Sequence, residues 1–185
     1  FSKLSFEQSL KWFSNSYGIK YAALRYFNAA GYDDSQRITG SEANSPNLIP
    51  LIMETAIGLR PYVSIFGNNY PTKDGTGIRD YIHVNDLAQA HIKSLEYINV
   101  KKENLIINLG SENGYSVLEI LEASKKITKV DIQCKIENPR KGDVAELIAS
   151  CTLAKDLIGW SQPKAGLEKI IKSTWDIYRN QIKFI

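Results

Sequence analysis

Apolar residues recur along this chain with two different periods. Longer segments carry them at helical spacing, whereas short runs rich in β-branched and aromatic residues lie between these segments. Helices that alternate with short apolar strands are typical of α/β proteins with buried parallel strands. The expected helices cover residues 1–17, 47–58, 85–97, 116–127, 152–158 and 167–184, and the expected strands cover 21–27, 63–66, 80–84, 105–109 and 132–136.

Local signals predict several helix ends. Gly18 and Gly159 each follow a helical segment, where glycine is the commonest terminating residue. Asn47 is a candidate N-cap, and Ser116 with Glu119 three residues later predicts a capping box. No capping residue precedes the helical pattern of residues 1–17, so we expect the sequence to begin inside a helix.

Composition narrows the function classes. The chain has 185 residues, 43% of them hydrophobic and 23% charged, and a net charge of +3. These values are ordinary for a globular protein and argue against binding to nucleic acid or a membrane surface. No apolar run is long enough to span a bilayer, and no secretory signal opens the sequence. We therefore expect a cytoplasmic protein.

Cysteine and histidine usage points the same way. Cys134 and Cys151 are too few for a disulfide framework, and we expect both to be buried free thiols. His83 lies within an apolar strand pattern and is expected to be packed and hydrogen-bonded. With His91 as the other histidine, no cluster has metal-ligand spacing, so no metal site is predicted.

The segment 66–84 is the most informative part of the chain. Its loop from Gly67 to Gly77 is rich in glycine, which lets backbone approach a ligand closely. Arg79 follows this loop and offers a planar fork for phosphate oxygens. The helix that starts near Asn47 supplies a second anion-binding feature, because its first N–H groups and its dipole favour negative charge.

These motifs together resemble one family. The segment 66–84, the run Arg25-Tyr26-Phe27-Asn28-x-x-Gly31 and the run Arg140-Lys141-Gly142-Asp143 are similar to those of the UDP-glucose (UDP-galactose) 4-epimerases, within the extended short-chain dehydrogenases/reductases. The resemblance covers residues 1 to about 178 and maps to the C-terminal half of that family only.

The family fold implied by this resemblance is α/β. It predicts a partial Rossmann-type fragment, from a doubly wound parallel sheet, and a small α+β substrate-binding domain. Residues 1–31 would end the NAD-binding domain, and residues 32–178 would form the UDP-sugar domain. Segments near residues 80–110 would pack back on the Rossmann part, and residues 179–185 would be a tail.

The resemblance also implies roles for the cofactor side of the site. Lys3 matches the lysine of a Tyr-x-x-x-Lys motif, whose tyrosine would lie two residues before Phe1 and is absent. In the family this lysine is catalytic, because it lowers the tyrosine pKa and holds the nicotinamide ribose of NAD. Tyr26 and Phe27 match residues beside the nicotinamide.

The substrate roles implied by the family involve a larger set, all of it around UDP. Backbone groups on one strand read the uracil, an amide binds the nucleotide-sugar, a helix start and two arginines bind the diphosphate, and a carboxylate accepts from the uridine ribose. The corresponding residues are Ser64 and Phe66, Asn28, Asn47 and Leu48, Arg79 and Arg140, and Asp143. Leu147 matches the residue that gates the sugar pocket, and its modest size predicts tolerance of N-acetylated sugars.

The implied activity is NAD-dependent interconversion of UDP-glucose and UDP-galactose through a 4-keto intermediate. The sequence has no Gly-x-x-Gly-x-x-Gly motif, which would seat the dinucleotide pyrophosphate. We therefore expect a truncated chain that carries mainly the UDP-sugar site and is inactive alone, from an enzyme that is a homodimer at full length. The alternatives are a related nucleotide-sugar epimerase, dehydratase or decarboxylase, such as one acting on UDP-GlcNAc, and a non-catalytic UDP-sugar-binding module.

Overall fold

The structure is a computed structural model, and it describes residues 2–42, 45–161 and 166–180. Its helices are α1 (Ser2–Tyr17), α2 (Leu48–Ala56), α3 (Val84–Lys101), α4 (Val117–Thr128), α5 (Thr152–Ile158) and α6 (Leu167–Tyr178). Its strands are β1 (Ala22–Tyr26), β2 (Asn28–Ala30), β3 (Val63–Phe66), β4 (Ile78–His83), β5 (Leu105–Leu109), β6 (Gly114–Ser116), β7 (Cys134–Glu137) and β8 (Glu146–Leu147).

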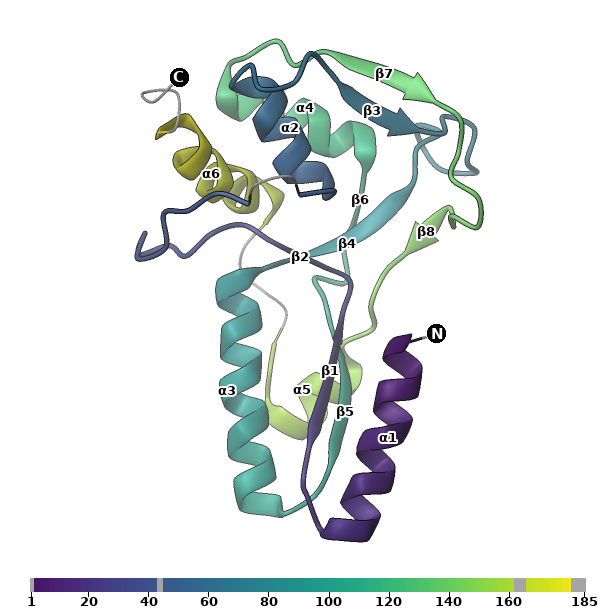
Figure 1. The fold of residues 1–185 in the computed structure, drawn as a ribbon, viewed down its shortest axis with the longest axis vertical. Coiled ribbons are helices and arrows are strands. Elements are labelled where there is room, and N and C mark those ends of the chain that lie inside the picture. The colour runs from purple at the N-terminus through teal and green to yellow at the C-terminus, as the bar shows by residue number, and fades with distance from the viewer. Residues whose placement is uncertain (1, 43–44, 162–165, 181–185) are drawn as a thin grey trace.

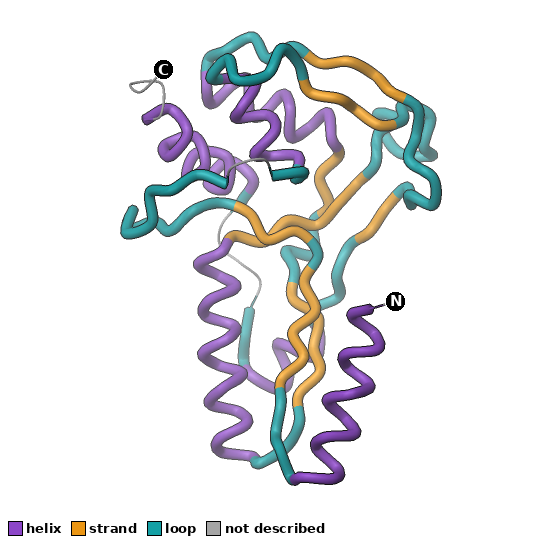
Figure 2. Tube along the Cα trace, in the orientation of Figure 1, coloured by secondary structure: helices purple, strands orange, loops and turns teal. Residues whose placement is uncertain are grey.

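Figures 1 and 2 show these elements in two groups along the long axis. The α1/β1 lobe comprises α1, β1, β5, α3 and α5, and the α2/β3 lobe comprises α2, α4, α6, β3 and β7. Strand β4 lies between the two groups and runs into α3 (Figure 1). Each lobe therefore has its own helices and strands, and β4 connects them.

The strand pairing agrees with the predicted α/β class. β1 pairs with β5, and β3 with β7, both in parallel. β4 pairs in parallel with β2 through Tyr81–His83, while its first half, from Ile78, pairs antiparallel with β6 and in parallel with β8. The element that carries the Arg79 motif is therefore the strand with the most neighbours.

Each lobe buries its own apolar cluster. In the α2/β3 lobe, α2, α4 and α6 cover β3 with side chains such as Ile52 and Ile171, which join Ile65 of the strand. In the α1/β1 lobe, Ala90 of α3 and Ala154 of α5 belong to one buried cluster with the strand β5. Within the described residues, no helix is long and apolar enough to cross a membrane.

Local chemistry explains the helix ends. The predicted capping box forms, with the Ser116 hydroxyl accepting from the Glu119 N–H at 3.0 Å and Glu119 accepting from the Ser116 N–H at 3.0 Å. Asn47 occupies the N-cap of α2, but its side chain makes no capping hydrogen bond. The N-cap of α3 is His83, whose Nδ1 accepts from the Asn85 N–H, a role that the sequence did not indicate.

Several predicted elements need correction. The strand expected at 21–27 ends at Tyr26, and β2 then starts at Asn28 in another sheet. The helix expected at 85–97 extends to Lys101, and the strand expected at 132–136 lies at 134–137. Helix α6 ends at Tyr178, and positions 181–184 of the expected helix lie outside the described residues. β2, β6 and β8 were not predicted because two or three residues are too few to show a period.

The expectation of two buried thiols is wrong for one of them. Cys151 is buried and its pKa is raised to about 11, mainly by burial. Cys134 is exposed, as are the other residues of β7. The predicted alternation of that strand is therefore absent, and the buried apolar residue nearby is Ile132, just before β7.

Helix α1 buries very little of itself. The residues expected to form its apolar face include Phe6, which is 66% exposed, and Phe13, which is 43% exposed, whereas the one buried residue is Ser14. Trp12, Phe13 and Tyr17 instead contact one another through ring edges and faces. The helical spacing was predicted correctly, but within this chain the face that it defines has little to pack against.

Asp80 joins β4 to two neighbouring segments through its buried carboxylate. It is 2% exposed and accepts hydrogen bonds from the Ser111 N–H and hydroxyl, both at 2.7 Å, from the Glu112 N–H at 3.2 Å and from the Ala149 N–H at 3.1 Å. The hydrogen bonds compensate the burial of the carboxylate. The donors in turn need this carboxylate as their acceptor. Asp80 thus fixes the β5–β6 connection and the segment after β8 against β4.

We expect Asp80→Ala to lower the free energy of unfolding by about 3 kcal/mol or more, because several buried donors lose their acceptor together. Asp131→Ala is the matched control, since Asp131 is exposed and accepts from the exposed Gln133 side chain. Urea unfolding followed by circular dichroism measures both. Equal midpoints for the two variants would contradict the role given to Asp80.

His83 is a second buried polar centre, 0% exposed. Its Nε2 lies 3.2 Å from the Ser173 hydroxyl of α6 and 3.8 Å from Asp34. Because Nδ1 accepts from the Asn85 N–H, Nε2 carries the proton in the neutral ring. Gly31 lies against the ring, where an added Cβ would come within 2.7 Å of Cδ2. The packed, hydrogen-bonded histidine predicted from the sequence is therefore found, and it joins β4, α6 and the 31–34 loop.

Burial lowers the pKa of His83 below its ordinary 6.5, against smaller opposing effects. Just below pH 6.5 the unfolded chain therefore binds more protons than the native chain. The contribution of the neutral His83 to stability is fully present above pH 6.5 and is lost as the pH is lowered. We expect the free energy of unfolding to decline from pH 7.5 to 5.5, and His83→Asn, which keeps a capping acceptor, to show a smaller decline. The charged groups facing the ring are Asp33, Asp34, Asp86 and Lys169. Equal slopes for the wild type and His83→Asn would refute the assignment.

Candidate functional site

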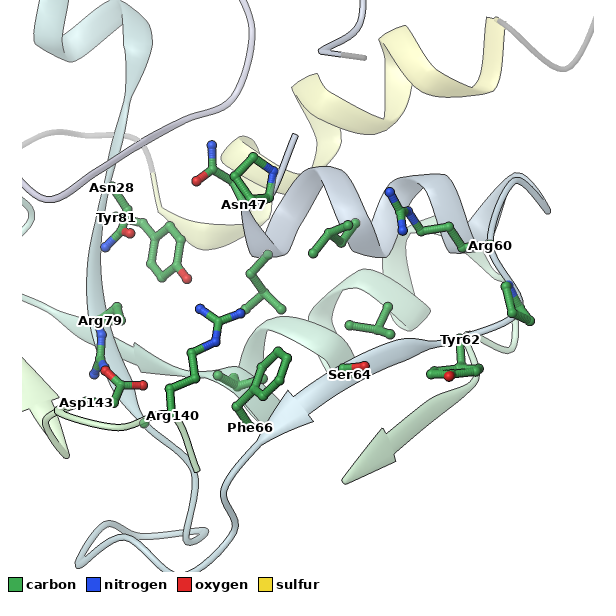
Figure 3. A pocket seen from close by; sticks show the side chains of 17 residues that line it. Asn28, Asn47, Arg60, Tyr62, Ser64, Phe66, Arg79, Tyr81, Arg140 and Asp143 are labelled. Atoms are coloured by element: carbon green, nitrogen blue, oxygen red, sulfur yellow. The ribbon is translucent and has the colours of Figure 1, made fainter. Parts of the chain in front are cut away.

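A cavity of about 570 Å³ lies between the start of α2, strand β3 and the first half of β4 (Figure 3). Most of the predicted substrate residues line it, although they are far apart in the sequence. Those present are Asn28, Asn47, Leu48, Ser64, Phe66, Arg79, Arg140 and Asp143. The sequence prediction that these residues converge is therefore supported by their geometry, whereas their individual roles stay predictions.

The start of α2 points toward this cavity through Asn47 and Leu48 (Figure 3). The first backbone hydrogen bond of the helix runs from the Leu51 N–H to the Asn47 carbonyl, at 3.1 Å. Pro50 has no N–H, and the N–H groups before it precede this first intrahelical bond. The positive end of the helix dipole therefore faces the cavity, as an anion site requires.

Arg79 is held by its neighbours rather than projecting freely. Its Nη1 donates to the Ile78 carbonyl at 2.7 Å, and its Nη2 donates to the carboxylate of Asp143. Gly77 leaves space for the guanidinium, because a Cβ there would lie 3.3 Å from Nη1. We expected Asp143 to be an acceptor for ribose, and here its carboxylate also orients Arg79 (Figure 3).

Arg140 contributes a different kind of cation. Its guanidinium carbon lies 4.0 Å from the centre of the Phe66 ring, a cation–π contact that presents the flat group toward α2 (Figure 3). Within the described part of the chain, no carboxylate forms an ion pair with it. The turn 140–143 is closed by the Asp143 N–H bonding to the Arg140 carbonyl at 3.1 Å, and Gly142 adopts φ +79° there.

Three polar lining residues were missed by the sequence analysis, namely Arg60, Tyr62 and Tyr81. Arg60 donates to the carboxylate of Glu54 on α2, which is 7% exposed. A signal for the tyrosines was available, because Tyr62 shares the period of Ser64 and Phe66, and Tyr81 shares that of Arg79. Burial raises the pKa of Tyr81 to about 12, with Arg79 opposing this effect.

A second hollow of about 370 Å³ continues from the first. The two share Asn28, Asn47, Leu48 and Tyr81, and the second extends past them to Tyr26 and Phe27 at the end of β1. The side-chain amide of Asn28 donates to the Asp80 carbonyl at 2.8 Å, which fixes its orientation where the hollows meet.

A groove of about 700 Å³ runs between α1, β1 and α3 and begins where the second hollow ends. It contains Lys3 together with Tyr26 and Phe27, the three residues predicted for the cofactor side. Leu147, the predicted gate, lies on β8 and is 39% exposed, but it is not among the residues that line either hollow. We call the groove, the second hollow and the cavity together the depression, because each shares lining residues with the next.

The sequence pattern of the NAD dependent epimerase/dehydratase family matches residues 1–110. The chain belongs to this family, as the resemblance predicted. Among curated proteins it is 41% identical over 179 residues to a UDP-glucose 4-epimerase of Lacticaseibacillus casei, covering 97% of this chain and 54% of that protein. It is 43% identical over 155 residues to a UDP-glucose 4-epimerase of Bacillus subtilis, covering 83% of this chain and 45% of that protein.

Solved structures agree. The UDP-glucose 4-epimerase of Stenotrophomonas maltophila, solved with bound NAD and formylated UDP-arabinopyranose, superimposes with a TM-score of 0.91 at 36% identity, covering 98% of this chain and 55% of that one. The UDP-Glc/GlcNAc 4-epimerase of Campylobacter jejuni gives a TM-score of 0.79 at 37% identity, covering 97% and 54%. The α/β class predicted from the sequence is confirmed, and the chain spans about half the length of these relatives.

Proposed function

We propose that this chain carries the UDP-sugar site of an NAD-dependent enzyme that interconverts UDP-glucose and UDP-galactose at C4 of the sugar. The observation that carries the proposal is the convergence of Arg140, Arg79 and the start of α2 on one cavity. Two guanidinium groups and the N–H groups of a helix start suit a diphosphate, because it is an anion with several acceptor oxygens. The names of the relatives support UDP-sugars as the ligand class.

The cavity and the second hollow divide this ligand between them. The uracil ring would lie against the face of β3 that presents Ser64 and Phe66, and the diphosphate would lie between Arg140 and the start of α2. The hexose would then extend past Asn28 into the second hollow, toward Tyr26. All the cationic groups are at the nucleotide end, so the handle is held while the neutral sugar is left free to present either face.

The groove around Lys3 fits the nicotinamide end of NAD. Its lining combines apolar and aromatic residues, including Phe27 and Leu24, with Lys3, and it shares Tyr26 and Phe27 with the second hollow. When bound, NAD would accept and return a hydride at the sugar carbon. The contribution of this chain is to hold the ribose through Lys3 and to place the ring beside the sugar through Tyr26 and Phe27.

A homodimer is also proposed for the complete enzyme. The exposed aromatic residues of α1, Trp12, Phe13 and Tyr17, form a contiguous apolar surface of the kind that helices bury between subunits. Sedimentation of the complete enzyme, with Trp12→Asp as the comparison, decides whether α1 contributes to such an interface.

We expect UDP to bind this chain saturably in isothermal titration calorimetry. Arg140→Ala should weaken binding by about tenfold or more, because a charge-assisted contact is lost. The affinity of Arg140→Lys for UDP should lie between those of the wild type and Arg140→Ala. Lysine keeps the charge but has no planar head group to stack on Phe66. Arg79→Ala should also weaken binding, by removing a cation and releasing Asp143.

Arg37→Ala is the control for this series, because Arg37 is exposed and pairs with Asp33 outside the cavity. It should bind UDP as the wild type does. Absence of UDP binding by a chain that is folded by circular dichroism would contradict the proposed site.

The 185-residue chain should show no epimerase turnover with NAD and UDP-galactose. In the family, the tyrosine spaced four residues before Lys3 takes the proton from the sugar 4-hydroxyl as general base, and that tyrosine is not in this sequence. Tyr97 and Lys101 repeat that spacing on α3, but the Tyr97 hydroxyl donates to Glu103 at 3.0 Å and lines neither hollow. Formation of UDP-glucose by this chain, detected by chromatography, would refute the prediction.

A further inference from the structure

The second hollow contains one formally charged side chain among the described residues that line it, that of Glu42. Its other walls are aromatic, small or amide-bearing, as at Tyr26, Phe27 and Asn28. Glu42 lies in the irregular segment between β2 and α2, and the residue is exposed rather than engaged in the core. Glu42 therefore brings the one formal negative charge to the described lining of the second hollow, beyond the cavity.

The backbone of Glu42 is held on both sides by tyrosines. Its N–H donates to the Tyr32 hydroxyl oxygen at 3.1 Å, and its carbonyl accepts from the Tyr178 hydroxyl at 3.3 Å. The two rings meet edge to face, 6.5 Å between centres, and Tyr178 is among the most buried side chains of the α2/β3 lobe. The main chain of this loop residue is thus anchored to the core, and this keeps its side chain near the hollow.

The charge of Glu42 acts on the same two tyrosine hydroxyls. Burial raises the pKa of Tyr178 and of Tyr32 above the ordinary value, and the negative charge of Glu42 adds to the rise for both hydroxyls. By contrast, the cations Arg79 and Arg140 line the cavity and not the second hollow. The two ends of the depression consequently have opposite charge character.

We propose that Glu42 selects the sugar: its carboxylate accepts hydrogen bonds from hydroxyl groups of a neutral hexose and repels a hexuronate. A carboxylate is acceptor-only and can take two hydroxyl donors at once, which suits adjacent hydroxyls of a pyranose. Against a sugar that itself bears a carboxylate, the same group acts by like-charge repulsion. This inference rests on the proposed function, because it takes UDP as the handle that brings the sugar into the second hollow.

The test compares UDP, UDP-galactose and UDP-glucuronate as ligands of the wild-type chain and of Glu42→Gln, which keeps the size and removes the charge. In calorimetry, Glu42→Gln should bind UDP unchanged, bind UDP-galactose about tenfold more weakly and bind UDP-glucuronate more tightly. Glu96→Gln, at an exposed acidic position on α3 outside both hollows, controls for net charge and should match the wild type for all three ligands.

The outcomes separate this inference from the proposed function. If the folded wild-type chain does not bind UDP, the proposed function fails and the role of Glu42 fails with it. If UDP binds but Glu42→Gln leaves the affinities for UDP-galactose and UDP-glucuronate unchanged, the UDP site stands and the role of Glu42 is overturned. If Glu42→Gln lowers the affinity for UDP itself, Glu42 acts on the whole site rather than on the sugar. That result also overturns the proposed role of Glu42. Glu42→Asp, which keeps the charge, should keep the discrimination against UDP-glucuronate.

Discussion

The buried carboxylate of Asp80 is the constraint on which the candidate site depends. Four donors from the β5–β6 connection and from the segment after β8 converge on it, and the carbonyl of the same residue accepts from Asn28. Because each donor would be costly to leave unpaired, the connection, the later segment and the start of β2 must take up their positions together. Asp80 lines neither the cavity nor the second hollow, yet Arg79 before it and Tyr81 after it both line the cavity.

Two of the three arginines that line the cavity, Arg79 and Arg140, illustrate different ways to hold a cation ready for an anion. Arg79 already has a carboxylate partner in Asp143, and a half-buried pair of this kind adds orientation more than net attraction. Arg140 instead stacks on Phe66, a contact that fixes the plane of the guanidinium without neutralising its charge. The positive potential of the cavity therefore comes mainly from Arg140 and from the start of α2, while Arg79 supplies geometry.

Sequence patterns predicted the parts of the fold and of the site that have a local or a family signal. The long helices and β1, β3, β4 and β5 have enough residues for their periods to be recognised, and the capping box at Ser116 is a purely local signal. The features that could not be predicted depend on residues distant in the sequence. His83, for example, caps α3 and at the same time contacts Ser173 of α6. In the site, the ion pair between Arg79 and Asp143 required the turn at Gly142 to be seen in three dimensions. Strand alternation, by contrast, could have identified Tyr62 and Tyr81.

The two ends of the depression are built from different segments. At the cavity, the lining groups come from β3, β4, the start of α2 and the turn 140–143, and the first three of these segments are supported by the apolar cluster of the α2/β3 lobe. At the sugar end, the wall is a loop whose position depends on Tyr32, Tyr178 and the His83–Ser173 contact. In the proposed site, changes in this loop would alter the sugar end and leave the segments around the anion site in place. Specificity for the nucleotide and specificity for the sugar would therefore be separable in the proposed site, because different segments of the chain would supply them.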